Sequence, residues 1–97
     1  MLEKVKDRLK ITWDDEDGTI QDIIEDGKYN LNDLTGVELD YQQNNLARSL
    51  LFEYCRYAYN NAADLFEENF QKEIMRLQLN CGVEQMKEDE EEDDTDD

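Results

Sequence analysis

Apolar residues recur at helical spacing in four stretches of the chain, and polar residues separate these stretches. In the first, Leu2, Val5 and Leu9 follow an i, i+3, i+7 pattern, which predicts a short amphipathic helix. Its outer surface is expected to be basic because of Lys4, Lys6, Arg8 and Lys10. In the second, the pattern runs from Ile20 to Leu34 and stops at Gly36, a residue typical of the position after a helix. This predicts a helix over about residues 16–34, with Asp14, Asp15 or Asp17 as its N-terminal cap.

The third stretch has the broadest apolar stripe, running from Leu46 to Ala58. It predicts a helix capped by Asp40 and broken near Asn60 and Asn61. The fourth stretch predicts a helix from Ala62 to about Arg76. After it, residues 77–79 either continue the helix or form a short extended piece. Together the four patterns predict an all-α fold, a small bundle of about four helices.

The charge of the chain divides it into two parts. Of the net charge of −17, the segment from residue 84 to 97 carries −9, with ten carboxylates and one lysine. So dense a run of like charge does not bury enough apolar surface to offset the entropy of ordering. We therefore predict a helical domain over residues 1–83 and a disordered polyacidic C-terminal tail over residues 84–97. Such a field disfavours direct binding to duplex DNA or anionic membranes and favours basic partners.

The composition argues against a metal, cofactor or catalytic site. Cys55 and Cys81 have no CxxC spacing, and the chain contains no histidine, so neither a zinc site nor a cysteine–histidine pair is expected. The acidic run at residues 14–18 resembles part of a calcium loop, but Trp13 and Ile24 would occupy its first and last ligand positions. No apolar run is long enough to span a bilayer. Carboxylates without a nucleophile or phosphate loop do not indicate an enzyme.

Aromatic residues are concentrated between Phe52 and Phe70. Their helical spacing favours a place in the core, and their number leaves open that Tyr57, Tyr59 and Phe70 line a protein interface instead. Trp13 either covers the core or contacts a neighbour. The candidate interface residues are Lys4, Arg8, Trp13, Tyr57, Tyr59, Phe66, Phe70, Met75, Leu77 and Leu79.

The order of these elements resembles a known family. The residues that carry the likeness are the basic stretch 2–12, the acidic residues 14–17, the Leu-Thr-Gly at 34–36, the run from Ala47 to Asn61, and the segments 66–70 and 73–79. In order and spacing these are similar to the head-tail connector (adaptor, or head-completion) proteins of long-tailed bacteriophages and prophages of Gram-positive bacteria. The likeness covers residues 1 to about 80 and does not include the polyacidic segment.

The resemblance implies a structural virion protein with no cofactor, assembled in the host bacterial cytoplasm and located at the head-tail interface. Such subunits form a homo-oligomeric ring, by resemblance a dodecamer, between the portal protein and the tail or stopper proteins. The ring extends the DNA channel, and DNA passes through without specific binding. In the family, the segment corresponding to residues 62–83 commonly reaches the portal or the neighbouring subunit.

The charge pattern agrees with this role, because acidic channel walls repel phosphate and let a duplex slide. Lys4 and Arg8 are expected to pair with acidic residues of the next subunit, a head-to-tail contact of the kind that closes rings. The alternative is a regulatory module whose acidic surface mimics DNA and occupies a basic site on a DNA-binding protein. Mimicry is expected to weaken steeply with salt, whereas apolar ring contacts are expected to weaken less.

Overall fold

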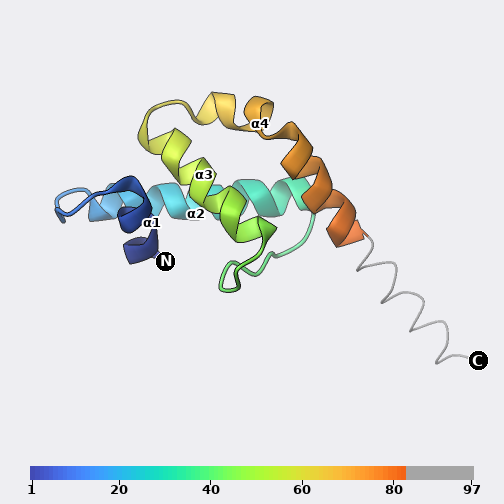
Figure 1. Ribbon diagram of the computed structural model, residues 1–97, viewed down its shortest axis with the longest axis horizontal. Coiled ribbons are helices and arrows are strands. Elements are labelled where there is room, and N and C mark those ends of the chain that lie inside the picture. Colours follow the sequence, from blue (N-terminus) through green and yellow to red (C-terminus); the bar gives the residue numbers. More distant parts are fainter. Residues whose placement is uncertain (83–97) are drawn as a thin grey trace, which may run out of the picture.

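The long helix α2 (Asp17–Thr35) packs against the helices that precede and follow it in the sequence. The computed structural model describes residues 1–82, and in this range the fold is all-α, as predicted. Helix α3 (Leu46–Tyr59) crosses α2, and α1 (Leu2–Leu9) contacts both (Figure 1). The C-terminal end of α2 is as predicted: Gly36 adopts a left-handed conformation, with φ 74°, and its amide donates to the Asn32 carbonyl at 2.8 Å. The polyacidic segment predicted over residues 84–97 lies outside the described residues.

Gly27 lets α2 and α3 approach each other closely. It is buried on the face of α2 that carries Ile24 and Leu31. A β-carbon at this position would lie 2.7 Å from Leu51 and 2.7 Å from the ring of Tyr54. A side chain of any size at residue 27 would therefore force the two helices or these side chains to move.

Two of the predicted helix caps are wrong. The N-cap of α2 is Glu16, which makes no side-chain cap hydrogen bond, and Asp14 binds Lys6 instead. Helix α3 begins at Leu46, where the Asn45 side chain accepts a hydrogen bond of 2.9 Å from the Arg48 amide. Asp40 lies too far upstream to cap α3. Its carboxylate instead accepts from the Gln42 amide at 2.9 Å, which forms a local turn.

The predicted helix over residues 62–76 is divided. The chain leaves α3 at Asn60 and Asn61, as predicted, with Asn61 at φ 58°. It then forms a 3-10 turn, η1 (Ala63–Leu65), and a single helical turn, α4 (Phe66–Asn69). Phe70 interrupts the helix, at φ −116° and ψ 24°, and residues 71–82 are again helical. Residues 77–79 therefore continue a helix and are not extended.

The core is closed by aromatic side chains from α3 and α4. Phe66 is fully buried, and the rings of Tyr54 and Tyr57 meet it edge to face, at centroid distances of 5.4 and 6.3 Å. Phe70 lies 5.3 Å from Phe66 and 5.6 Å from Tyr57. Edge-to-face contacts of this kind add to the stabilisation that burial supplies. Phe66 and Phe70 are one helical turn apart, so both rings reach the same aromatic cluster.

Candidate interaction surfaces

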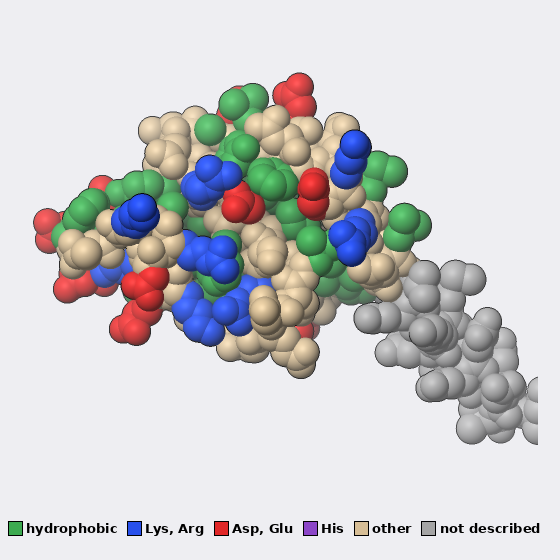
Figure 2. Space-filling view, in the orientation of Figure 1, with side chains coloured by type: hydrophobic (Ala, Val, Ile, Leu, Met, Phe, Trp, Pro, Cys, Tyr) green, Lys and Arg blue, Asp and Glu red, His purple; other side chains and the backbone are tan. Residues whose placement is uncertain are grey.

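The exposed basic side chains of α1 gather beside the start of α3. The guanidinium carbon of Arg8 lies 4.4 Å from the centroid of the Phe52 ring, and that of Arg48 lies 5.5 Å from it. Because Phe52 is only 5% exposed, its ring is a fixed platform for both cations. Lys4 is exposed one turn before Arg8 on the same side of α1. We call Lys4, Arg8 and Arg48 the basic face; Figure 2 shows lysine and arginine side chains gathered in this region.

The exposed carboxylates of α2 lie on the opposite side of that helix from the core. Its buried positions are Ile20, Ile24, Gly27 and Leu31, and its exposed carboxylates fall half a turn away, at Asp22, Glu25, Asp26 and Asp33. We call these four residues the acidic face. Lys28 is the one basic residue of α2 and lies 3.9 Å from Glu25. Because α3 packs on the buried side of α2, the acidic face points away from α3.

The charge is therefore unevenly distributed over the body. Residues 1–10 and α3 together hold six basic and three acidic side chains, whereas residues 12–35 hold one basic and eight acidic side chains. Within residues 1–82 the basic face and the acidic face of α2 therefore carry opposite charge, although the total charge of the chain is strongly negative. Such a distribution favours contact between unlike sides of two molecules over contact between like sides.

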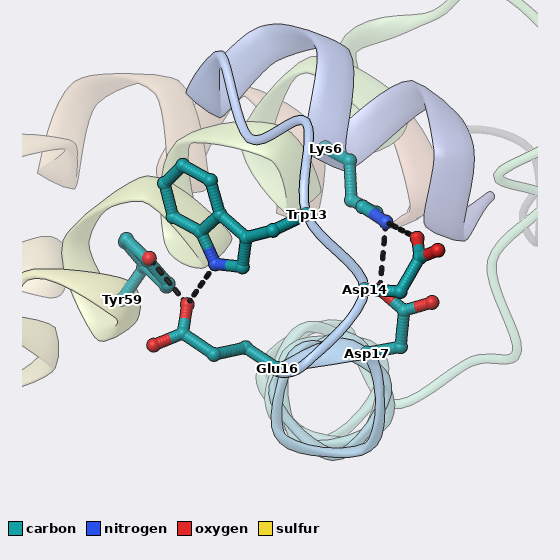
Figure 3. A network of polar contacts seen from close by, with 6 residues as sticks. All are labelled: Lys6, Trp13, Asp14, Glu16, Asp17 and Tyr59. Atoms are coloured by element: carbon teal, nitrogen blue, oxygen red, sulfur yellow. Dashed lines mark hydrogen bonds and ion pairs between the residues drawn. The ribbon is translucent and has the colours of Figure 1, made fainter.

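The loop between α1 and α2 is fixed by two polar contacts that the sequence analysis did not foresee (Figure 3). Lys6 was expected on the basic outer surface of the first helix. Its side chain is instead only 11% exposed, and Nζ lies 2.7 Å from Oδ1 of Asp14 and 2.7 Å from Oδ1 of Asp17. These contacts raise the pKa of Lys6, and the hydrogen bond from Lys6 lowers the pKa of Asp14. The acidic run at residues 14–17 thus holds the loop to α1.

Glu16 makes the second contact, on the other side of the loop. Its carboxylate accepts a hydrogen bond of 3.2 Å from the Trp13 indole and one of 2.5 Å from the Tyr59 hydroxyl (Figure 3). The hydrogen bond to Glu16 raises the pKa of Tyr59. Trp13 remains 47% exposed. The loop therefore presents the indole to the outside while joining the N-terminal end of α2 to the last residue of α3.

The predicted interface residues fall into three groups. Phe66 and Leu77 are 0% and 6% exposed, so both belong to the core and present no surface to a partner. Partly buried are Tyr57, Tyr59 and Phe70, which pack against the core. Exposed are Lys4, Arg8, Trp13, Met75 and Leu79, with Met75 at 60% and Leu79 at 68%. Met75 and Leu79 are one turn apart, and they are the exposed large apolar side chains near the end of the described chain.

A groove of about 500 Å³ separates the end of the 71–82 helix from the start of α3. Leu77 and Cys81 line one side, and Leu46 and Ala47 line the other. Glu38 and Asp40, from the loop after α2, also line it. The groove therefore has an apolar floor and an acidic rim. No three histidine, cysteine or carboxylate side chains within residues 1–82 converge so that they could hold a metal ion.

Comparisons of the chain with protein families, with characterised proteins and with solved structures find no match. The resemblance to head-tail connectors stays a prediction from the sequence. None of the helices over residues 1–82 has the length and apolar character needed to cross a membrane.

Proposed function

We propose that the chain is a non-catalytic structural subunit of a bacteriophage head-tail connector, which assembles into a ring between the portal and the tail or stopper. The observation that carries the proposal is the separation of the basic face from the acidic face of α2. Copies with a net charge of −17 repel one another unless their contact sets unlike charges together. A head-to-tail contact between the two faces does this, and its repetition closes a ring.

The exposed apolar side chains supply a second surface for such a subunit. Met75 and Leu79 are among the most exposed large apolar residues, at 60% and 68%. They lie in the segment that, by resemblance, reaches the portal or the neighbouring subunit. Apolar contact is less sensitive to salt than charge pairing. A portal contact through these residues therefore supports a ring whose subunits also pair through charges.

Native mass spectrometry of the chain mixed with a purified portal oligomer of the same phage tests the proposal. We expect one copy for each portal subunit. Reversing the charge at Lys4 and Arg8 is expected to prevent ring closure, and adding Asp22→Lys and Asp26→Lys to the same chain is expected to restore it. Lys72→Glu is the matched control, because Lys72 is exposed but lies outside the basic face. A portal that takes up no copies would refute the connector role.

A second candidate function is DNA mimicry by the acidic face. Its four carboxylates extend along α2 from Asp22 to Asp33, a rise of about 16 Å at 1.5 Å per residue. The test is displacement of duplex DNA from a purified basic DNA-binding protein. Mimicry predicts displacement that weakens steeply with salt and is lost with Asp22→Asn, Asp26→Asn and Asp33→Asn together. The connector role predicts no displacement.

A further inference from the structure

We propose that the acidic segment, residues 84–97, binds in the free chain to the basic face of its own α1 and α3. The segment carries ten carboxylates, and the basic face is the part of the described body where two arginines lie over one aromatic ring. This inference concerns the isolated chain and does not depend on its being part of a connector.

The side chains of the basic face are held in place by contacts within the described body. Phe52 holds Arg8 and Arg48 on one ring, and the Nη1 of Arg48 also donates to the Gln42 carbonyl at 3.4 Å. Within residues 1–82 neither arginine forms an ion pair with a carboxylate, whereas Arg56 further along α3 pairs with Glu53 at 2.5 Å. Lys72 and Arg76 of the 71–82 helix also form no ion pair within residues 1–82, but of the cations described there only Arg8 and Arg48 lie over one shared ring. Cations fixed in this way bind an anion with less loss of side-chain entropy than freely moving ones.

The described chain ends close to this surface. Cys81 and Ala47 line the same groove, and Arg48 follows Ala47 directly. An extended chain advances about 3.4 Å per residue, so residues 83–88 span about 20 Å. This is sufficient to pass the start of α3. The consecutive carboxylates from Glu88 to Asp94 can then reach Arg48 and Arg8. Figure 2 shows lysine and arginine side chains gathered on the body between α1 and α3.

The groove itself is not the binding place for this segment. Glu38 and Asp40 on its rim repel an incoming acidic chain. Arg48, which follows the groove-lining Ala47, lies at the N-terminal turn of α3, whose dipole also favours an anion. Charge repulsion on one side and attraction on the other therefore direct the segment toward the basic face.

Attachment to the same chain favours this contact over contact with a second copy. A short linker gives a tethered segment an effective concentration in the millimolar range. A second copy at micromolar concentration is far more dilute and carries the same net charge of −17. The contact is therefore expected within one molecule.

A spin label at position 95 of the full chain tests the proposal. Thr95→Cys is labelled with a nitroxide while Cys55 and Cys81 are buried, and the label's effect on the amide signals of the ¹⁵N-labelled chain is measured by NMR. We expect loss of signal intensity at Arg8, Arg48 and Phe52, and recovery in 1 M salt, where the screening length falls to about 3 Å. Unlabelled Thr95→Cys is the reference.

Variants and mixing separate the possible outcomes. Arg8→Gln with Arg48→Gln should restore the signals, whereas Arg56→Gln, which removes a cation already paired with Glu53, should leave the loss unchanged. If the double variant fails to fold, the salt titration of the parent chain decides. In a mixing experiment, spin-labelled chain without ¹⁵N is added to unlabelled ¹⁵N chain. If signals at the basic face are lost only in this mixture, the contact is between copies and the proposal is overturned. Loss elsewhere, or no localised loss, would also overturn it.

Discussion

Substituting alanine for Gly27 should destabilise the fold, although alanine is normally the better helix residue. A glycine inside a helix is about 0.5 to 1 kcal/mol less favourable than alanine, so helix propensity alone would make Gly27→Ala more stable by that amount. Against this, the new methyl would lie 2.7 Å from Leu51, which is fully buried, and 2.7 Å from Tyr54, whose ring packs on Phe66. Overpacking a core in this way destabilises by about 1 to 3 kcal/mol. We expect a net loss of about 1 to 2 kcal/mol.

Gly18→Ala is the matched control, because it makes the same substitution on the same helix. Nothing lies within 4 Å of a β-carbon at Gly18, so this variant should be as stable as the parent or more stable. Urea unfolding followed by far-ultraviolet circular dichroism measures both variants. The same comparison can be made by thermal unfolding, where a loss of 1 kcal/mol lowers the Tm of a domain of this size by about 4 to 8 °C. If Gly27→Ala were as stable as Gly18→Ala, the close approach of α2 and α3 at Gly27 would be refuted.

Three other substitutions or reactions test local features. Asn45→Ala should reduce the stability by about 1 kcal/mol through loss of the cap on α3, and Asp40→Ala should reduce it less; urea midpoints compare them, and an equal loss would contradict the cap assignment. The hydrogen bond from Lys6 lowers the pKa of Asp14 below its ordinary value of 3.8, so the contact between them stabilises the fold above pH 3.8, and this stabilisation is lost as the pH falls through the folded pKa of Asp14. The Tm of Lys6→Gln should therefore fall less steeply on acidification than that of the parent chain, and parallel curves of Tm against pH would count against the contact. Burial raises the pKa of Cys55 to about 12, so a thiol reagent at pH 8 should modify it only at the rate of unfolding, and rapid modification in the folded chain would exclude this burial.

The spacing of apolar residues predicted a helix correctly where its apolar stripe packs against one neighbouring helix. The end of α2 followed from the spacing up to Leu34 and from Gly36, and the break after α3 followed from Asn60 and Asn61. Both features depend on local conformational preferences, because glycine and asparagine accept positive φ more readily than other residues. Such signals remain readable in a single sequence.

The errors occurred where tertiary contacts outweighed local preference. The spacing of Phe66, Phe70 and Ile74 is consistent with one continuous helix, but the helix is interrupted at Phe70, where both phenylalanines contact Tyr57 of α3. Lys6 lies on the inner side of α1 because Asp14 and Asp17 neutralise it there. Neither contact is visible in the spacing along the chain, since each partner comes from a different element.

The basic face is shared by two of the proposed contacts, so they compete. In a free chain the tethered acidic segment has a millimolar effective concentration, which favours it over the acidic face of a second copy at micromolar concentration. On a portal, neighbouring copies are held side by side, and that advantage is lost. Replacing the seven carboxylates from Glu88 to Asp94 by glutamine or asparagine should therefore let copies associate through the basic face without a portal. Native mass spectrometry of the free chain measures this. If the neutralised chain associates only when Lys4 and Arg8 are intact, the segment restrains assembly. If the neutralised chain remains monomeric, the two contacts do not compete, and the acidic segment is not what keeps free copies apart.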